Sequence, residues 1–400
     1  MAYHPPQHIL ENYAHVLVNY ALGSGRGIKK NEVVFLQVPE SAKPLLIELN
    51  KAVLKSGAHP IIQYLPDEMM KDFFLNADSN QVKFFPSTYL KGKLEQADHI
   101  LSIIAETNKH ELEGVDPLKI MEHDLAFKPY KEWREEKENQ QKFTWTLGLY
   151  GTPAMAKEAG LTEEECWNQI IRACFLNKTD PLSQWRSTQK EVDRLRSKLN
   201  SLNIKKINIK SHNTNLTIGV GEQRQWLGGG GRNIPSFELF ISPDWRQTEG
   251  SVYFDLPLYR YGNLIEGIFL EFKSGRVVEA KARKGQKMLR EMIRALNADK
   301  VGEFSLTDKR FSKINKFMAE TLYDENFGGD HGNFHIALGS AYKESYAGDI
   351  LNLSSGGWDQ LGFNQSAVHT DIISTKNRRV TATCNGGNKI LLYKNGTFQI

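Results

Sequence analysis

The chain has 400 residues, of which 40% are hydrophobic, and this length suits two or three domains with buried cores. A formal net charge of +4 argues against a nucleic-acid-binding protein, and no stretch approaches the ~20 apolar residues that cross a bilayer. The three cysteines (166, 174 and 384) lack CxxC spacing, and we expect no secretory signal in residues 1–22, which have no basic segment before an apolar run. We therefore expect a cytoplasmic protein that binds neither nucleic acid nor a membrane.

The first half alternates between helical and strand patterns. Apolar residues at helical spacing predict helices over residues 9–22, 41–56, 68–75 and 89–96. Short apolar runs predict strands over residues 33–38, 59–65, 99–105 and 143–150. Strands separated by helices indicate βαβ units, so we expect an α/β N-terminal domain with a mostly parallel sheet over residues 1–190.

Two further helices follow. Thr162 and Glu165 have the spacing of a capping box and predict the start of a helix. A long charged helix over residues 182–202 is interpreted as the junction between domains.

The second half is dominated by strand patterns. Strands are predicted over residues 206–211, 215–220, 238–241, 252–256, 264–273 and 276–282. Ser274-Gly275 and the Asn-Gly pairs at 385–386 and 395–396 are strong signals for tight turns. We expect an α+β C-terminal domain rich in antiparallel strands over residues 191–400. The most basic stretch, residues 281–294, carries apolar residues at helical spacing, which favours a solvated helix face over a phosphate-binding track.

Familiar nucleotide and nucleophile motifs are missing. The glycines at 23, 25 and 27 precede a strand, whereas a dinucleotide-binding loop follows one. The four glycines at 228–231 are not followed by Lys-Ser/Thr, and a mobile loop beside a site is the better interpretation. No GxSxG motif is present.

Candidate metal ligands lie in four segments of the second half. His369 and Asp371 are two residues apart on a predicted strand and therefore point to the same face. A buried pair of this kind is either hydrogen-bonded or bound to a metal. His335 begins an apolar strand, Glu325 precedes a glycine-rich turn and Tyr342 follows the strand.

The other two segments each carry one glutamate. Glu238 stands among apolar residues, and Glu303 stands between a glycine and an aromatic residue. Each of the four segments, taken alone, favours an ordinary structural role: a paired histidine, a glycine turn or a solvent-facing glutamate.

Taken in order, the segments resemble a known family. NIPSFELFISP, YGNLIEGIFLEFKSGRVVEAKARKG, VGEFSLTD, TLYDENFGG, HIALGSAY and SAVHTDIIS are similar to blocks of the M29 metallo-aminopeptidases, also called the leucyl aminopeptidase T family. The resemblance covers nearly the whole chain. It departs from the family at Phe237, where glycine is usual, and in a longer loop after Glu325 that adds His331.

The resemblance implies a metal site and an activity. The implied ligands are Glu238, Glu303, Glu325, His335, His369 and Asp371. The implied catalytic residues are Tyr342, which binds no metal, and Glu303. His331 is left open as a loop residue or an additional ligand, and Phe237 is expected to narrow the pocket. A homodimer is implied, with the N-terminal domain shaping access to the site.

The ligand chemistry suits two divalent ions. Four carboxylates balance two 2+ charges, and oxygen and nitrogen ligands fit Zn, Co, Mn or Mg. We expect an aminopeptidase that releases N-terminal residues from peptides with a free N-terminus, using a water activated by two metals. Tyr342 would stabilise the oxyanion, and Glu303 or Glu325 would move a proton. The alternatives are another dinuclear hydrolase, such as a dipeptidase or an amidase, and a non-catalytic metal-stabilised binding protein.

Overall fold

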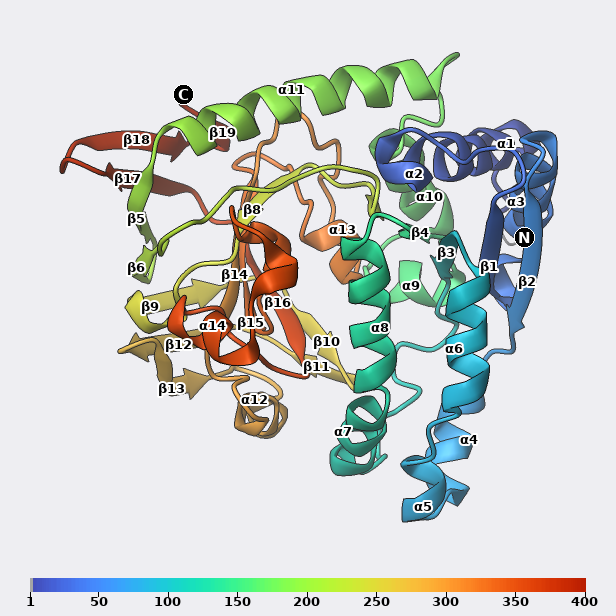
Figure 1. Ribbon diagram of the computed structural model, residues 1–400, viewed down its shortest axis with the longest axis horizontal. Coiled ribbons are helices and arrows are strands. Elements are labelled where there is room, and N and C mark those ends of the chain that lie inside the picture. The colour runs from blue at the N-terminus through green and yellow to red at the C-terminus, as the bar shows by residue number, and fades with distance from the viewer. Residues whose placement is uncertain (1–2) are drawn as a thin grey trace. The chain divides into compact units, whose positions relative to one another are not determined.

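A parallel sheet with helices on both faces forms the first half of the chain (Figure 1). The computed structural model describes residues 3–400. The five strands, all parallel, lie in the order β2-β1-β3-β4-β7. Their bounds are β1 (Val33–Pro39), β2 (His59–Leu65), β3 (His99–Ile104), β4 (Thr144–Leu149) and β7 (Asn233–Ile234).

Most helices of this part connect successive parallel strands, while the first two precede β1 and the last two follow β4. The helices are α1 (Gln7–Val16), which continues through a π-helical turn (Leu17–Ala21), α2 (Leu22–Gly25), α3 (Lys43–Lys55), α4 (Met69–Asn76), α5 (Ser79–Val82), α6 (Ser87–Gln96), α7 (Pro117–Ala126), α8 (Lys128–Asn139), α9 (Pro153–Glu158) and α10 (Glu163–Ala173). The strand order reverses direction at β1, so right-handed connections place α3 on one face and α6 and α8 on the other. On the second face, Phe35, Ile100 and Phe143 form a buried cluster with Leu94 of α6, against which Trp133 of α8 packs.

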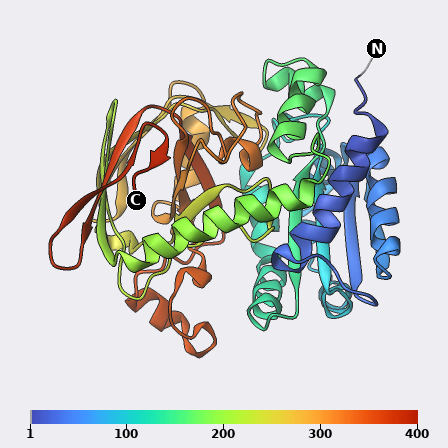
Figure 2. The same ribbon diagram turned by 90° about the horizontal axis from the view of Figure 1, so that it is seen from above.

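The chain divides into two compact units, and a short segment from the second half of the sequence belongs to the first unit. The first unit comprises residues up to Ser187 together with Gly230–Ser236, and the second comprises Thr188–Gly229 and Phe237–Ile400. Helix α11 (Pro181–Ser201), seen along its length in Figure 2, is part of the connection. The sequence predicted a single boundary after residue 190 and did not anticipate the returning segment, which supplies β7.

The second unit contains two larger antiparallel sheets and a short hairpin. One sheet has the order β13-β12-β9-β6-β5-β17-β18-β19, the other has the order β16-β15-β14-β8, and β10 pairs with β11. The strand bounds are β5 (Ile204–Ser211), β6 (Thr214–Gly219), β8 (Glu238–Ile241), β9 (Thr248–Phe254), β10 (Leu258–Arg260), β11 (Asn263–Ile265), β12 (Ile268–Lys273), β13 (Arg276–Lys281), β14 (Val301–Thr307), β15 (Asn333–Gly339), β16 (His369–Ser374), β17 (Arg378–Cys384), β18 (Lys389–Lys394) and β19 (Thr397–Phe398). The helices are α12 (Gln286–Arg294), α13 (Thr321–Asp324) and α14 (Ser355–Gln360).

One apolar core joins these two sheets. Ile207 and Ile209 of β5 and Val252 of β9 lie in the same buried cluster as Phe304 of β14 and Ile336 of β15. Strand residues alternate between faces, so the residues next to these in the sequence point away from the core. Each sheet therefore has one apolar inner face and one outer face that is available for polar groups.

The predicted fold class is confirmed, with local corrections. The single strand predicted over residues 264–273 is wrong, because Gly267 has a φ of +63° and separates β11 from β12. Helices α7 and α8 were missed; α8 (KPYKEWREEKEN) is mostly charged and buries no residue completely. The basic stretch forms α12, with Met288, Leu289 and Met292 buried as expected. None of the helices within residues 3–400 has the length and apolar composition that a bilayer crossing requires.

The capping box at the start of α10 provides a test of local stability. The Thr162 hydroxyl accepts a hydrogen bond from the Glu165 backbone N–H, and the Glu165 carboxylate accepts one from the Thr162 N–H. Thr162→Ala should lower the free energy of unfolding in urea by about 1 kcal/mol because it leaves a helix donor without its partner. Thr162→Ser retains the hydroxyl and should stay close to the wild type. Equal destabilisation by both substitutions would contradict the capping role.

Candidate metal centre

Five predicted ligands lie on one face of the four-stranded sheet. Opposite residues in an antiparallel pair share a face, and Ser305 of β14 lies opposite His335 of β15. Asp371 and His369 of β16 lie opposite Ala337 and Gly339. By the same register Glu303 lies opposite Ala337, and Glu238 of β8 lies opposite Thr307. The strand alternation that buries Phe304 and Ile336 in the core therefore directs Glu238, Glu303, His335, His369 and Asp371 to the outer face.

Small residues keep the space between these side chains open. Ala337 lies across from both Glu303 and Asp371, and Ser305 lies next to His335. Gly339, with a φ of +109°, lies opposite His369, and a Cβ there would overlap the backbone of Val368. Phe240 and Ile373, opposite Ser305 and His335, are large apolar residues of this face, whereas the positions opposite Glu303, Asp371 and His369 carry only alanine and glycine.

The five side chains form two groups that share one residue. Ligand atoms of Glu238, Glu303 and His335 lie within 4.8 Å of one another, and so do those of Glu303, His369 and Asp371. Glu303 faces both histidines: its Oε1 is 3.2 Å from His335 Nε2, and its Oε2 is 3.5 Å from His369 Nε2. The two oxygens of one carboxylate thus serve two neighbouring groups.

The two groups differ in their access to solvent. The His335 side chain is 1% exposed and that of Glu303 is 4% exposed. The side chains of His369 and Asp371 are 24% and 14% exposed. A molecule arriving from solvent would therefore reach the group of His369 and Asp371 first.

Both histidines direct Nε2 towards the carboxylates. His369 Nδ1 lies 2.8 Å from the Ser340 carbonyl oxygen, which can only accept, so Nδ1 carries a proton and Nε2 is the nitrogen that can bind a metal once it loses its own proton. His335 Nε2 lies 3.3 Å from Glu238 Oε2, while its buried Nδ1 has no hydrogen-bond partner within the described part of the chain. This orientation fits metal ligation through Nε2 of each ring.

The electrostatics of the five residues also fit a bound cation. Burial raises the pKa of Glu303 to about 7 despite its contact with His335. Burial lowers the pKa of each histidine, but the surrounding carboxylates outweigh it, so the pKa of His369 rises to about 9 and that of His335 also rises. Burial likewise opposes ionisation of Asp371, yet the adjacent His369 holds its pKa below the usual value. Without a metal, bound protons therefore supply the positive charge that this cluster requires.

Glu325 lies beside the cluster but in neither three-residue group. It follows α13, and its carbonyl accepts hydrogen bonds from Thr307 Oγ1 and Asn333 Nδ2 at 3.1 and 2.9 Å. Its pKa is raised well above the usual value, first by burial and then by the charge of Glu238. The side chain therefore faces the same acidic cluster from a turn rather than from the sheet.

Tyr342 is positioned by its backbone and by its ring. Its N–H donates to Ser242 Oγ at 2.8 Å, and its ring lies edge-on to His369 with centroids 5.0 Å apart. Burial, followed by the charge of Glu303, raises the pKa of Tyr342 well above its usual value. The phenol therefore stays protonated and can donate a hydrogen bond near the metal ligands.

The structure gives structural roles to the two departures from the family pattern. The His331 carbonyl accepts a hydrogen bond from buried Arg378 at 3.0 Å, and His331 joins neither group of potential ligands among residues 3–400. Phe237 is 1% exposed, and its N–H donates to Asn326 Oδ1 at 2.6 Å. This bond ties the start of β8 to the turn that carries Glu325.

The sequence analysis did not identify the residues that hydrogen-bond to the predicted ligands. Ser305 donates to Glu238 Oε2 at 3.1 Å, and the Ser340 carbonyl orients His369. Ser305 could have been found, because it lies two residues after Glu303 on the same strand face. No local pattern identifies Ser340.

The glycines at 228–231, predicted as a mobile loop, have close backbone neighbours. A Cβ at Gly228 would overlap the Glu238 carbonyl oxygen, and one at Gly231 would overlap that of Ala21. Glycine at these two positions therefore lets the backbone pass close to the neighbouring backbone at Glu238 and at Ala21.

The carboxylates and imidazoles gathered on this sheet face, with no cysteine among them, are a donor set that could hold divalent metal ions of the kind hydrolases use. The profile of the thermophilic metalloproteases (M29) matches residues 6–398. The chain belongs to the M29 metalloprotease family. The resemblance found in the sequence and the predicted enzyme class are confirmed, and the family implies a divalent metal.

Similar proteins span the same length. Aminopeptidase PepS of Streptococcus thermophilus is 26% identical over 98% of each chain. Aminopeptidase T of Thermus thermophilus is 27% identical over 96% of this chain and 98% of its own. The solved structure of wild-type AmpT from Thermus thermophilus has a TM-score of 0.84 with 25% identity, covering 98% of this chain and 99% of that one. The chain therefore shares the fold of AmpT over nearly its whole length.

The pKa shifts predict proton release when a metal binds. At pH 7 the metal-free site holds protons on His369, whose pKa is about 9, and partly on Glu303, whose pKa is about 7. Ligation requires the deprotonated groups, so binding must displace these protons, and affinity should rise as the pH increases from 6 to 9. Calorimetric titration of chelated protein with Zn²⁺, in buffers of different ionisation enthalpy, measures the number released. No proton release, or an affinity that falls over this range, would contradict the proposed electrostatics.

Proposed function

We propose that this protein is a metal-dependent aminopeptidase that removes N-terminal residues from peptides by means of two divalent ions. The observation that best supports two ions is the position of Glu303, whose two carboxylate oxygens face His335 in one group and His369 in the other. Two groups of ligands that share one carboxylate match the design of paired-metal hydrolases, in which a carboxylate links the ions. The aminopeptidase names of the M29 relatives support the same reaction for this chain.

The ligands divide between two ions. Glu238 and His335 would hold one ion, and His369 and Asp371 the other, with Glu303 shared between them. Glu325, assigned as a ligand by the family resemblance, completes a set of four carboxylates and two imidazoles. Four negative charges and two 2+ ions leave the loaded site close to neutral, and hard oxygen and nitrogen donors suit Zn, Co, Mn or Mg.

When bound, the ions would polarise the scissile carbonyl and provide a water that is acidic enough to act as a nucleophile near neutral pH. Tyr342, kept protonated, would donate a hydrogen bond to the carbonyl oxygen as negative charge develops on it. Glu303 or Glu325, whose pKa values are both raised by burial, would transfer a proton to the leaving amine.

Exopeptidase action would follow from recognition of the free α-amino group of the substrate. This group would bind one of the metal ions or a carboxylate of the site, whereas a blocked N-terminus can do neither. The more exposed group of His369 and Asp371 is where the peptide would enter. We assign the metal centre to the C-terminal domain, residues 191–400.

The homodimer and the cytoplasmic location predicted from the sequence form part of this proposal. Cysteines 166, 174 and 384 form no disulfide within residues 3–400, and burial raises the pKa of the Cys166 thiol to about 12, which suits an unreactive thiol in a reducing compartment. Light scattering during size-exclusion chromatography tests the homodimer.

The substrate requirement separates the candidate activities. Aminoacyl-p-nitroanilides with a free amine should be cleaved, their N-acetyl analogues should not, and chelation should abolish cleavage until Zn²⁺, Co²⁺ or Mn²⁺ is restored. Cleavage of dipeptides but of no longer peptide would favour a dipeptidase, and cleavage of the blocked amides would favour an amidase. Metal-dependent melting without any turnover would favour a binding protein.

The Tyr342 hydroxyl provides a test of mechanism. Tyr342→Phe should reduce kcat by about 100-fold, because one donor to the developing oxyanion is lost, while metal content stays at the wild-type level. Tyr346→Phe is the matched control, since the Tyr346 ring packs on Trp358 and Phe363 rather than on a ligand. Nearly full activity in Tyr342→Phe, or equal losses in both variants, would refute the role of Tyr342.

A further inference from the structure

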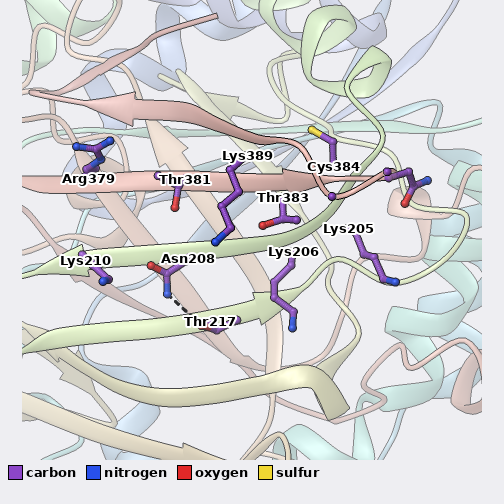
Figure 3. Close-up of a pocket in the computed structure, with 13 residues that line it drawn as sticks. Lys205, Lys206, Asn208, Lys210, Thr217, Arg379, Thr381, Thr383, Cys384 and Lys389 are labelled. Atoms are coloured by element: carbon purple, nitrogen blue, oxygen red, sulfur yellow. Dashed lines mark hydrogen bonds between the residues drawn. The ribbon is translucent and has the colours of Figure 1, made fainter.

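A basic groove crosses the outer face of the eight-stranded sheet (Figure 3), and none of the proposed metal ligands lines it. It has a volume of about 760 Å³. No acidic side chain lines the groove. Its five cations come from β5, β17 and β18: Lys205, Lys206, Lys210, Arg379 and Lys389.

These cations are not neutralised within the protein. All five are exposed, and none forms a side-chain hydrogen bond or an ion pair with any other residue in 3–400. Elsewhere in the second unit, exposed arginines such as Arg276 and Arg283 pair with carboxylates at 2.7 and 2.6 Å. The groove therefore concentrates unpaired positive charge in a chain whose net charge is only +4.

The strand register forces these charges together. Arg379 of β17 lies opposite Lys210 on one side and Lys394 on the other. Thr383 lies between Lys206 and Lys389 in the same manner. Like charges directly opposite on a sheet are destabilising, so this arrangement carries a cost in stability.

Protection of a sheet edge does not explain the lysines. Lysine often guards an exposed edge strand against unwanted pairing. Here β5 lies between β6 and β17, and β17 lies between β5 and β18, so both are interior strands. The charges therefore project from the middle of a sheet that is already paired.

We propose that this groove binds an extended acidic segment of a partner polypeptide. Lys206 and Lys210 are four residues apart on β5, which separates the two cationic ends by about 13 Å. An extended peptide repeats its side chains with the same spacing, so carboxylates four residues apart would meet both ends. Asn208, Thr217 and Thr381 lie between the ends and supply hydrogen-bonding groups (Figure 3).

The composition of the groove favours a peptide over nucleic acid. Single-stranded nucleic acid is usually held by aromatic side chains that stack on its bases, and none lines the groove. The volume lies within the range of about 300–1,000 Å³ typical of small ligand sites, which suits a short segment rather than a folded domain. Ile207 and Ile209 point from the same strand into the core that underlies the metal-bearing sheet. A segment in the groove would therefore leave the metal-bearing face uncovered.

Binding can be measured on the whole metal-loaded protein. The probe is an N-acetylated peptide of alternating Glu and Ser with a C-terminal fluorophore, because acetylation removes the free amine that the proposed peptidase site requires. Fluorescence anisotropy should show binding that weakens with added salt, and the corresponding Lys-Ser peptide should not bind. Absence of binding by the Glu-Ser peptide at low salt would overturn the proposal.

Charge-matched variants locate the site. Lys206→Glu with Arg379→Glu should weaken binding at least about tenfold, or about 1.4 kcal/mol. Lys273→Glu with Lys316→Glu makes the same change in net charge at exposed positions outside the groove and should have little effect. Lys206→Gln with Arg379→Gln provides a second test if charge reversal impairs folding, and aminopeptidase activity should be unchanged in every variant.

The remaining outcomes decide against the proposal. Equal weakening by the groove and control variants would show non-specific attraction. Tighter binding of an oligothymidylate or of tripolyphosphate than of the acidic peptide, lost in the groove variant, would replace the polypeptide with a phosphate-bearing ligand.

Discussion

The arrangement of the second unit depends on the cost of burying several carboxylates together. Glu238 and Glu303 are almost completely buried, and Asp371 lies beside them on the same sheet face. Carboxylates this close cannot all remain ionised without a compensating positive charge. In the metal-free chain, protonation of the two histidines and a raised Glu303 pKa supply part of this compensation. Two divalent ions would supply the remaining positive charge. The electrostatic repulsion among the buried carboxylates, which opposes folding, would therefore favour metal binding.

The surrounding fold meets this constraint with a sheet whose two faces have opposite character. Phe304 and Ile336 anchor β14 and β15 in the core, and alternation then fixes Glu303 and His335 on the other face. Ala337 and Gly339 keep the space between them open. The Ser340 carbonyl and the Ser305 hydroxyl restrain His369 and Glu238. Stability and ligand geometry therefore come from the same strands.

Local patterns predicted most of the elements but few of the relationships between them. The parallel strands of the first unit were found because burial on both faces makes them short apolar runs. The strand in segment 230–236 was not predicted, because it has only two residues, is defined by its pairing with β4 and has no periodicity of its own. His369 and Asp371 were placed on one face by spacing alone, whereas the sharing of Glu303 between two groups depends on pairing across β14, β15 and β16. The basic groove escaped notice for the same reason, because Lys210 and Arg379 are far apart in the sequence and adjacent only in the sheet.

The sharing of Glu303 by two ions is the central claim, and anomalous diffraction from crystals of the zinc-loaded protein tests it most directly. Data collected on both sides of the zinc absorption edge should show two anomalous peaks per chain, one on each side of the Glu303 carboxylate. One peak should lie next to Glu238 and His335, and the other next to His369 and Asp371. A single peak, or two peaks of which one lies away from Glu303, would contradict the shared-carboxylate site.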